Sequence, residues 1–263
     1  MSLVGGAVVF DADGTLLDSL PPHVGFCHSM NAELGASLQL PAIDDIAGCR
    51  ALSAAPMENF LRKAGFSEPH VAAAIKRYED SFATMHPVRV FSGVPEMLRR
   101  LKVAGLRLAV VSSNTSKNVR TGLANGVAPP AGATAEQATD PGLVVDSDAF
   151  EFVWGIDNAS RSKAEALAAA SKHLGVPSKH FIYVGDTIKD AFSAQQAGLG
   201  LFLGANWGGF EDMHAAVGQL NQLYFGHDGP PPGPARFMAG GGLTPVGSVE
   251  ALEGHITEYF STL

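Results

Sequence analysis

Few cysteines, no long apolar run and no excess of positive charge set the first limits on what this sequence encodes. The chain of 263 residues has two cysteines, Cys27 and Cys49, without CxxC spacing, so neither a disulfide framework nor a zinc site is indicated. No 18 consecutive residues are apolar, and the first apolar run ends at Asp11 with no basic segment before it. These absences argue against a membrane span and a signal peptide, and we expect a cytoplasmic protein with free thiols.

The charge balance limits the partners of the chain. Its formal net charge is -8, whereas proteins that bind nucleic acids or anionic membranes normally present a basic face, so we expect neither partner. With 46% hydrophobic and 17% charged residues, the chain has the composition of an ordinary globular protein of one large or two smaller domains. If such an acidic protein handles an anionic substrate, its site needs a local cation.

Short apolar runs that alternate with helical patterns predict an α/β fold with a mainly parallel sheet. Apolar residues recur at helical spacing over 94–101, and helices are also predicted over 163–174 and near 190–198. The runs are continuous, as in strands that are buried on both faces. They are AVVF (7–10), LRLAVV (106–111), FIYV (181–184) and GLFL (200–203), with FEFVW (150–154) as a weaker candidate.

Residues 20–86 lack strand signals and carry two apolar stripes at helical spacing, which predicts a small helical bundle inserted after the first strand. Its two connections fall near 16–20 and 86–92, and paired linkers of this kind can act as a hinge. The stripes are Met57, Phe60, Leu61 and Ala64, then Val71, Ala74, Ile75, Tyr78, Phe82 and Met85.

Polar side chains follow three of the predicted strands at their carboxyl ends, where open parallel sheets bind ligands. A lysine, Lys163, also begins the helix predicted over 163–174. Four carboxylates, a hydroxyl cluster and a lysine are therefore expected to converge on one crevice. The residues are Asp11 and Asp13 after the first strand, Ser112, Ser113 and Asn114 after the second, and Asp186 with Asp190 after the third.

In this order the segments DADGT, VVSSN, Lys163 and GDTIKD resemble the four motifs of the haloacid dehalogenase-like hydrolases. The resemblance covers nearly the whole chain, and the helical insertion falls where that family places its C1-type cap. It implies a three-layer, Rossmann-like α/β core formed by residues 1–19 and 87–263. Residues 20–86 are then expected to form the helical cap domain.

The resemblance also implies a Mg²⁺-dependent phosphatase that works through an aspartyl-phosphate intermediate. Asp11 is the expected nucleophile, Asp13 the general acid and base, and Lys163 the cation that stabilises charge during transfer. The expected Mg²⁺ ligands are Asp11, the main-chain carbonyl of Asp13, Asp186 and, through a water, Asp190. Simpler interpretations remain: the first two aspartates as an acidic turn or a helix cap, Asp190 as a helix cap, and Lys117 or Lys172 in place of Lys163.

The substrate contacts are predicted in two parts of the chain. Ser112 and the backbone N–H groups of Ser113 and Asn114, at a helix start, are expected to bind phosphoryl oxygens, unless Ser112 only caps that helix. Arg50 lies in AGCR (47–50), which resembles the cap loop that points into the active site, and His23 matches a cap histidine of some relatives. Both are candidate substrate contacts, with a solvated arginine and a structural histidine as the alternatives.

The resemblance to phosphatases is favoured by Asp13. Dehalogenases of this family lack an acid at this position, because their leaving group needs no proton, and phosphonatases carry a small residue at it. The serine of DS (18–19) and the segment NWGG (206–209) resemble the phosphoglycolate phosphatase-like subgroup. A β-phosphoglucomutase-like activity is the alternative, and a non-catalytic phosphometabolite-binding protein is a further one.

The expected partner is a small phosphorylated metabolite, and the chain is expected to be a monomer or homodimer. Residues 125–148 and 221–243 are rich in proline, glycine or alanine and have no counterpart in compact relatives. They are expected to be loops or insertions that lie near the cap or at the periphery.

Overall fold

A six-stranded, all-parallel sheet forms the centre of the computed structural model, which describes residues 5–126, 145, 147–158, 162–208, 210–216 and 242–263. The strand order is β5-β4-β1-β6-β7-β8, with β1 between β4 and β6. The predicted α/β class with a parallel sheet is confirmed. The strands are β1 Ala7–Phe10, β4 Arg107–Val111, β5 Phe152–Trp154, β6 Phe181–Gly185, β7 Leu201–Ala205 and β8 Gly242–Val246.

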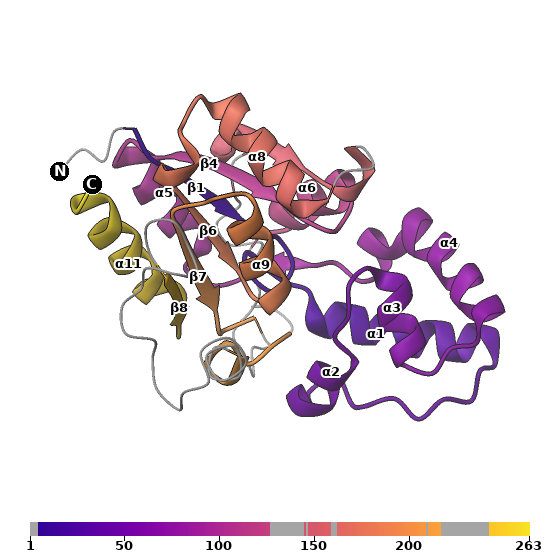
Figure 1. Cartoon of the computed structure of the whole chain (residues 1–263). Helices are drawn as coiled ribbons and strands as arrows, with labels where there is room; N and C mark the ends of the chain where they lie inside the picture. Colours follow the sequence, from indigo (N-terminus) through magenta and orange to yellow (C-terminus); the bar gives the residue numbers. More distant parts are fainter. Residues whose placement is uncertain (1–4, 127–144, 146, 159–161, 209, 217–241) are drawn as a thin grey trace.

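Helices cover both faces of the sheet, which makes three layers (Figure 1). Side chains alternate along each strand: Val8 and Phe10 pack toward the layer of α5, α6 and α11, whereas Ala7 and Val9 pack toward α8 and α9. The apolar runs in the sequence are continuous because both faces of the sheet are covered by helices and buried. The helices are α5 Val94–Val103, α6 Ser116–Ala124, α8 Lys163–Leu174, α9 Ile188–Gln196 and α11 Val249–Ser261.

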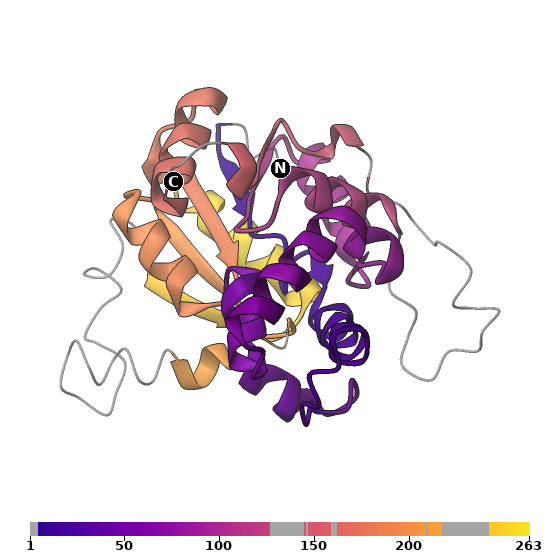
Figure 2. The same ribbon diagram turned by 90° about the vertical axis from the view of Figure 1, so that its right-hand side faces the viewer.

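Between β1 and the rest of the sheet, residues 20–86 form four consecutive helices. We call this segment the helical insertion. It lies beyond one end of the sheet (Figure 1) and in front of it in the turned view (Figure 2). Its helices are α1 Leu20–Leu34, α2 Ile46–Leu52, α3 Met57–Lys63 and α4 Glu68–Met85. The two apolar stripes predicted a helical bundle here and fall on α3 and α4, whereas α1 and α2 carry neither stripe.

The two connections of the helical insertion pair with one another. The short strands β2 (Leu17–Asp18) and β3 (Arg89–Val90) form an antiparallel ladder, with Leu17 opposite Val90. Two-residue strands are too short to show a periodicity in the sequence, so this pairing was not predicted. It holds both ends of the insertion together where they leave the core.

Several local expectations were wrong. Met85 is 49% exposed and does not belong to the buried stripe of α4, because the helix ends there. The segment 47–50 lies inside α2 and is not a loop. Residue 242 begins the edge strand β8, although residues up to 243 were predicted to form a loop. Pro245 is tolerated in this strand because β8 pairs with a neighbour on one side only. Most of the two expected loops, residues 127–144 of the first and 221–241 of the second, lies outside the described residues.

Candidate active site

The carboxyl ends of β1, β4 and β6 bring the predicted residues together. Asp11 and Ser112 continue the ladders of their strands, since Asp11 N donates to Val184 O at 2.8 Å and Ser112 N to Trp154 O at 3.0 Å. Their side chains, with that of Asp186 after β6, therefore emerge at the same edge of the sheet. This edge and the helical insertion enclose a pocket of about 790 Å³. All of the candidate site residues line it: Asp11, Asp13, His23, Arg50, Ser112, Ser113, Asn114, Lys163, Asp186 and Asp190.

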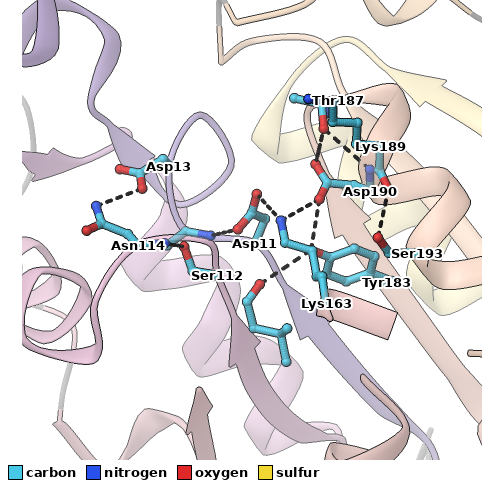
Figure 3. A network of polar contacts seen from close by, with 12 residues as sticks. Asp11, Asp13, Ser112, Asn114, Lys163, Tyr183, Thr187, Lys189, Asp190 and Ser193 are labelled. Carbon is cyan, nitrogen blue, oxygen red and sulfur yellow. Dashed lines mark hydrogen bonds and ion pairs between the residues drawn. The ribbon is translucent and has the colours of Figure 1, made fainter. Parts of the chain in front are cut away.

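Lys163 lies between two carboxylates (Figure 3). Its Nζ donates to Asp11 Oδ2 at 3.0 Å and to Asp190 Oδ1 at 2.5 Å. Burial would lower the pKa of Lys163, but the adjacent Asp11 and Asp190 carboxylates raise it above its ordinary value, so the amine is a cation. Lys117 and Lys172 do not line the pocket, which leaves Lys163 as the lysine beside Asp11.

The first turn of α8 explains how Lys163 reaches this place. Ser162 is the N-cap, and its hydroxyl and the Glu165 carboxylate form a capping box that fixes where the helix begins. Lys163 is then the first helical residue, and its side chain extends from the start of α8 to the edge of β1 (Figure 3). Its side chain is 16% exposed.

Asp190 both caps a helix and belongs to the polar network. Its Oδ2 accepts from Thr187 Oγ1 at 2.6 Å and from Thr187 N at 3.1 Å, in a capping box at the start of α9. Its Oδ1 accepts from Lys163 and, at 3.2 Å, from the Tyr183 hydroxyl. The helix-cap interpretation of Asp190 is thus correct, and the same carboxylate also holds Lys163 in place.

Asp11, Asp186 and Asp190 form a buried acidic cluster in which one carboxylate oxygen of each residue lies within 4.8 Å of those of the other two. Asp186 Oδ2 has no hydrogen-bond partner among the described residues. Burial, with repulsion from Asp190 and Asp11, raises the pKa of Asp186 well above its usual range. Burial likewise raises the pKa of Asp11 to about 7, although Lys163 opposes the change. A bound cation would stabilise the ionised form of these buried carboxyls, whose pKa is raised by burial and mutual repulsion. Carboxylate oxygens are also the ligands that hard divalent ions prefer.

The turn after β1 allows these carboxylates to approach one another. Gly14 has φ +72°, a left-handed conformation that side-chain-bearing residues rarely adopt. A Cβ atom at this position would lie 2.0 Å from Asp186 Oδ2, so only glycine leaves room for that carboxylate. The glycine of the DADG sequence is therefore required by the space beside Asp186 as well as by the turn.

Asp13 lies on the other side of Asp11 from Lys163 (Figure 3). Its Oδ2 accepts from Asn114 Nδ2 at 2.9 Å, whereas Oδ1 has no partner in the described part of the chain. One carboxylate oxygen is therefore held by a hydrogen bond, whereas the other is buried and has no partner among the described residues.

The serine cluster differs from the prediction in one respect. The helix after β4 begins at Ser116 with Thr115 as its N-cap, so Ser113 and Asn114 precede the helix. Ser112 therefore does not cap the helix; its buried hydroxyl accepts from Asn114 N at 3.1 Å. The three residues line the pocket as a turn, and the Asn114 N–H is already used within that turn.

The helical insertion contributes the opposite wall of the pocket. Arg50 in α2 and His23 in α1 both line it, together with α3 and α4 side chains. His23 is buried, and its Nε2 lies 3.1 Å from the Tyr78 hydroxyl. Burial lowers the pKa of His23, although the nearby Asp13 carboxylate opposes this change.

Three residues of the network were missed: Thr187, Tyr183, which was predicted only as part of a buried strand, and Tyr78. Thr187 could have been found, because Thr-x-x-Asp in GDTIKD is a capping-box pattern. Tyr78 was predicted only as part of an apolar stripe. The sequence of an amphipathic helix does not show whether the hydroxyl of a tyrosine reaches a polar site or whether its ring only packs. Among the described residues, no helix is both long and apolar enough to span a bilayer.

Comparisons with known proteins agree with this arrangement. The profile of the haloacid dehalogenase-like hydrolases matches residues 6–198. A phosphoglycolate phosphatase of Caulobacter vibrioides is 31% identical over 208 residues, which are 75% of this chain and 78% of that protein. An N-acetylmuramic acid 6-phosphate phosphatase of Pseudomonas aeruginosa is 30% identical over 201 residues, 73% of this chain and 78% of its own length. A haloacid dehalogenase-like family hydrolase from Streptococcus pneumoniae has a similar structure, with a TM-score of 0.64, 18% identity, and coverage of 97% of this chain and 100% of that one.

Proposed function

Because the chain belongs to the haloacid dehalogenase-like hydrolase family, within its phosphoglycolate phosphatase-like subgroup, we propose that it hydrolyses a small phosphomonoester through an aspartyl-phosphate on Asp11, with Mg²⁺ as cofactor. The matches to phosphatases confirm the prediction of a hydrolase that acts on phosphoric monoesters. One observation carries the finer proposal. Asp11 is paired with Lys163 inside a buried acidic cluster, at the base of a pocket large enough for a metabolite.

The acidic cluster fits Mg²⁺. Asp186 has an unpartnered, buried oxygen among the described residues, and the cluster carries more negative charge than Lys163 offsets. Asp11 and Asp186 would hold the ion, with the main-chain carbonyl of Asp13 as the family resemblance implies. Asp190, whose two oxygens already accept four hydrogen bonds, would contribute through a water and by holding Lys163. When bound, the ion supplies positive charge that offsets the repulsion between these carboxylates and the phosphoryl oxygens.

Asp11 would attack the phosphorus atom while the ester oxygen leaves on the opposite side. A new bond forms between an Asp11 carboxylate oxygen and phosphorus, and the bond from phosphorus to the ester oxygen breaks. Lys163 lies within hydrogen-bond distance of Asp11 and would stabilise the negative charge of the transferring group. The lysine also favours the ionised form of Asp11, which is the form that attacks.

Asp13 would donate a proton to the leaving oxygen and later accept one from the water that hydrolyses the aspartyl-phosphate. Its Oδ2 is held by Asn114, so Oδ1 is the oxygen that remains for this transfer. The Ser112 hydroxyl and the Ser113 N–H would bind the non-bridging phosphoryl oxygens from the turn that follows β4, whereas the predicted Asn114 N–H is already used by Ser112 Oγ.

The helical insertion would act as a cap domain (residues 20–86) over a core of residues 1–19 and 87–263. The antiparallel contact of β2 with β3 supports a hinge at the base of this cap. Arg50 and His23, on the cap side of the pocket, would contact the part of the substrate away from phosphorus. A β-phosphoglucomutase-like transfer to a second sugar hydroxyl is the alternative, because Asp11 could serve it equally.

The fate of the phosphoryl group tests the proposal. The purified protein would be incubated with Mg²⁺ and with phosphoglycolate, N-acetylmuramic acid 6-phosphate or glucose 1-phosphate, and free phosphate and isomerised sugar phosphate would be measured. We expect Mg²⁺-dependent release of phosphate and a loss of at least ~10⁴-fold in Asp11→Asn, since a carboxamide is not a nucleophile. Asp80→Asn, exposed on α4, is the matched control and should retain full activity. Isomerised sugar phosphate without net phosphate release would favour the mutase.

A further inference from the structure

A chain of hydrogen bonds connects the helical insertion to Asp13. The Tyr78 hydroxyl, on α4, lies 3.1 Å from His23 Nε2 of α1 and 3.4 Å from Asn114 Nδ2 of the core. Asn114 Nδ2 in turn donates to Asp13 Oδ2 at 2.9 Å. Tyr78 is thus a side chain of the insertion whose polar atom reaches, through one amide, the carboxylate that would protonate the leaving group.

The orientation of the Asn114 amide is fixed by its other contacts. Asn114 Oδ1 accepts from Thr115 N at 2.8 Å and from Asn118 Nδ2 at 3.1 Å. The NH₂ group must therefore face Asp13 and Tyr78, because a flipped amide would lose both donors and place its oxygen against a carboxylate. With one proton directed to Asp13, the other is directed to the Tyr78 hydroxyl.

The Tyr78 ring is held firmly enough to act as a fixed partner. It is 7% exposed, stacks on Phe82 with ring centres 4.4 Å apart, and meets Phe26 edge-on at 5.5 Å. Both phenylalanines belong to the helical insertion, so the hydroxyl moves with the insertion and not with the core. The packing of the ring does not need the hydroxyl, which instead makes polar contacts with His23 and Asn114.

We propose that Tyr78 is a positioning residue that holds the Asn114 amide against Asp13, so that the general acid is aligned when the helical insertion is seated on the core. The proposal rests on the proposed function, because it gives Asp13 the role of acid. Tyr78 itself touches neither the phosphoryl group nor the leaving oxygen in this scheme.

The proposal makes a prediction that a merely structural role would not. Protonation of the leaving oxygen matters for alkyl phosphates, whose alkoxides are poor leaving groups: the Asp13 O–H bond breaks, and the proton passes to the ester oxygen as its bond to phosphorus breaks. It matters little for p-nitrophenyl phosphate, whose phenolate leaves without a proton. A misaligned acid therefore slows the first class of substrate selectively, whereas a distorted site slows both.

The test compares Tyr78→Phe with wild type on an alkyl phosphate that the enzyme accepts and on p-nitrophenyl phosphate. We expect kcat/KM to fall about tenfold for the alkyl ester and to change less than about twofold for the aryl ester. The matched control is Tyr183→Phe, which removes another buried hydroxyl from the other side of the site, where it contacts Asp190. That variant should affect both substrates to a similar degree.

Asp13→Asn separates the failure of this inference from the failure of the proposed function. It should lower the rate with the alkyl ester by ~10²–10⁴-fold and that with the aryl ester far less. In the Asp13→Asn background, Tyr78→Phe should have no further effect, because the two changes act on one step. If Asp13→Asn is selective but Tyr78→Phe lowers both substrates equally, or neither, Tyr78 does not position the acid. If Asp13→Asn shows no selectivity, its role as the acid is wrong, and the inference falls with it.

Discussion

The two walls of the pocket are built differently. On the core side, Asp11, Lys163 and Asp190 come from separate elements and hold one another at 2.5–3.0 Å, and the carboxylates are buried. On the side of the helical insertion, the lining includes Met57, Glu79 and other side chains that are partly or fully exposed. The polar groups of the core therefore fix one another by direct hydrogen bonds, whereas the insertion lines the pocket with a mixture of buried residues, such as Phe60, and more exposed ones.

This difference implies a division of labour. Groups that act on phosphorus need fixed geometry, since small displacements reduce reaction rates strongly. Groups that contact the rest of the substrate can differ in type and mobility, because they do not act on the reacting atoms. Apart from Asp13, whose loss matters most for esters with a poor leaving group, changes in the core should therefore lower kcat for every substrate. Changes in the insertion should depend on the substrate. The Tyr78–Asn114 contact is the exception, where the insertion reaches the chemistry.

The largest effect that is shared by all substrates, after loss of Asp11, is expected from Lys163→Met. This change removes the cation between Asp11 and Asp190 and should lower kcat by ~10²–10³-fold with all substrates, a size typical of lost electrostatic stabilisation. Initial rates with an alkyl and an aryl ester would measure it. Lys172→Met, in the last turn of the same helix, is the matched control and should be silent. A strong effect at Lys172 and none at Lys163 would reverse the assignment.

A smaller effect is expected on thermal stability, which reports Mg²⁺ binding without an activity assay. A ligand at 100 times its Kd adds about 2.7 kcal/mol to the free energy of unfolding, which in a domain of this size raises Tm by roughly 5–10 °C. We expect Mg²⁺ to raise Tm in wild type in this way, and Asp186→Asn to abolish most of the rise. Thermal unfolding with and without Mg²⁺ would measure it, and Asp212→Asn, which is exposed, serves as control. Equal shifts in the two variants would place the ion elsewhere.

The smallest effect is expected in the helical insertion. Arg50→Ala should raise KM about tenfold for esters that carry a second anionic group and leave kcat near wild type, because the contact is equal in the ground and transition states. Steady-state kinetics with phosphoglycolate and p-nitrophenyl phosphate would separate the two cases. Arg62→Ala is the control, since Arg62 pairs with Glu68 on the exposed side of the insertion. A fall in kcat with both esters would mean that the division between the two walls is wrong.

How far the sequence predicted the structure also differs between the two regions. Asp11, Ser112 and Asp186 were expected to meet because parallel strands end at one edge, a rule that depends only on topology. The position of Lys163 was predicted because it begins the helix that was expected over 163–174. In contrast, the helical state of 47–50, the pairing of β2 with β3 and the contact between Tyr78 and Asn114 depend on how segments far apart in the chain pack, and local patterns do not contain that information.

Detection of the phosphoryl group on Asp11 would test the central claim most directly. The protein would be mixed with substrate and Mg²⁺, quenched in acid within milliseconds, digested and analysed by mass spectrometry. The account predicts a phosphoryl group on the peptide that contains Asp11, formed and lost at rates that support turnover, and absent in Asp11→Asn. Turnover by a protein that carries no phosphoryl group at any stage, or carries it on another residue, would contradict the account.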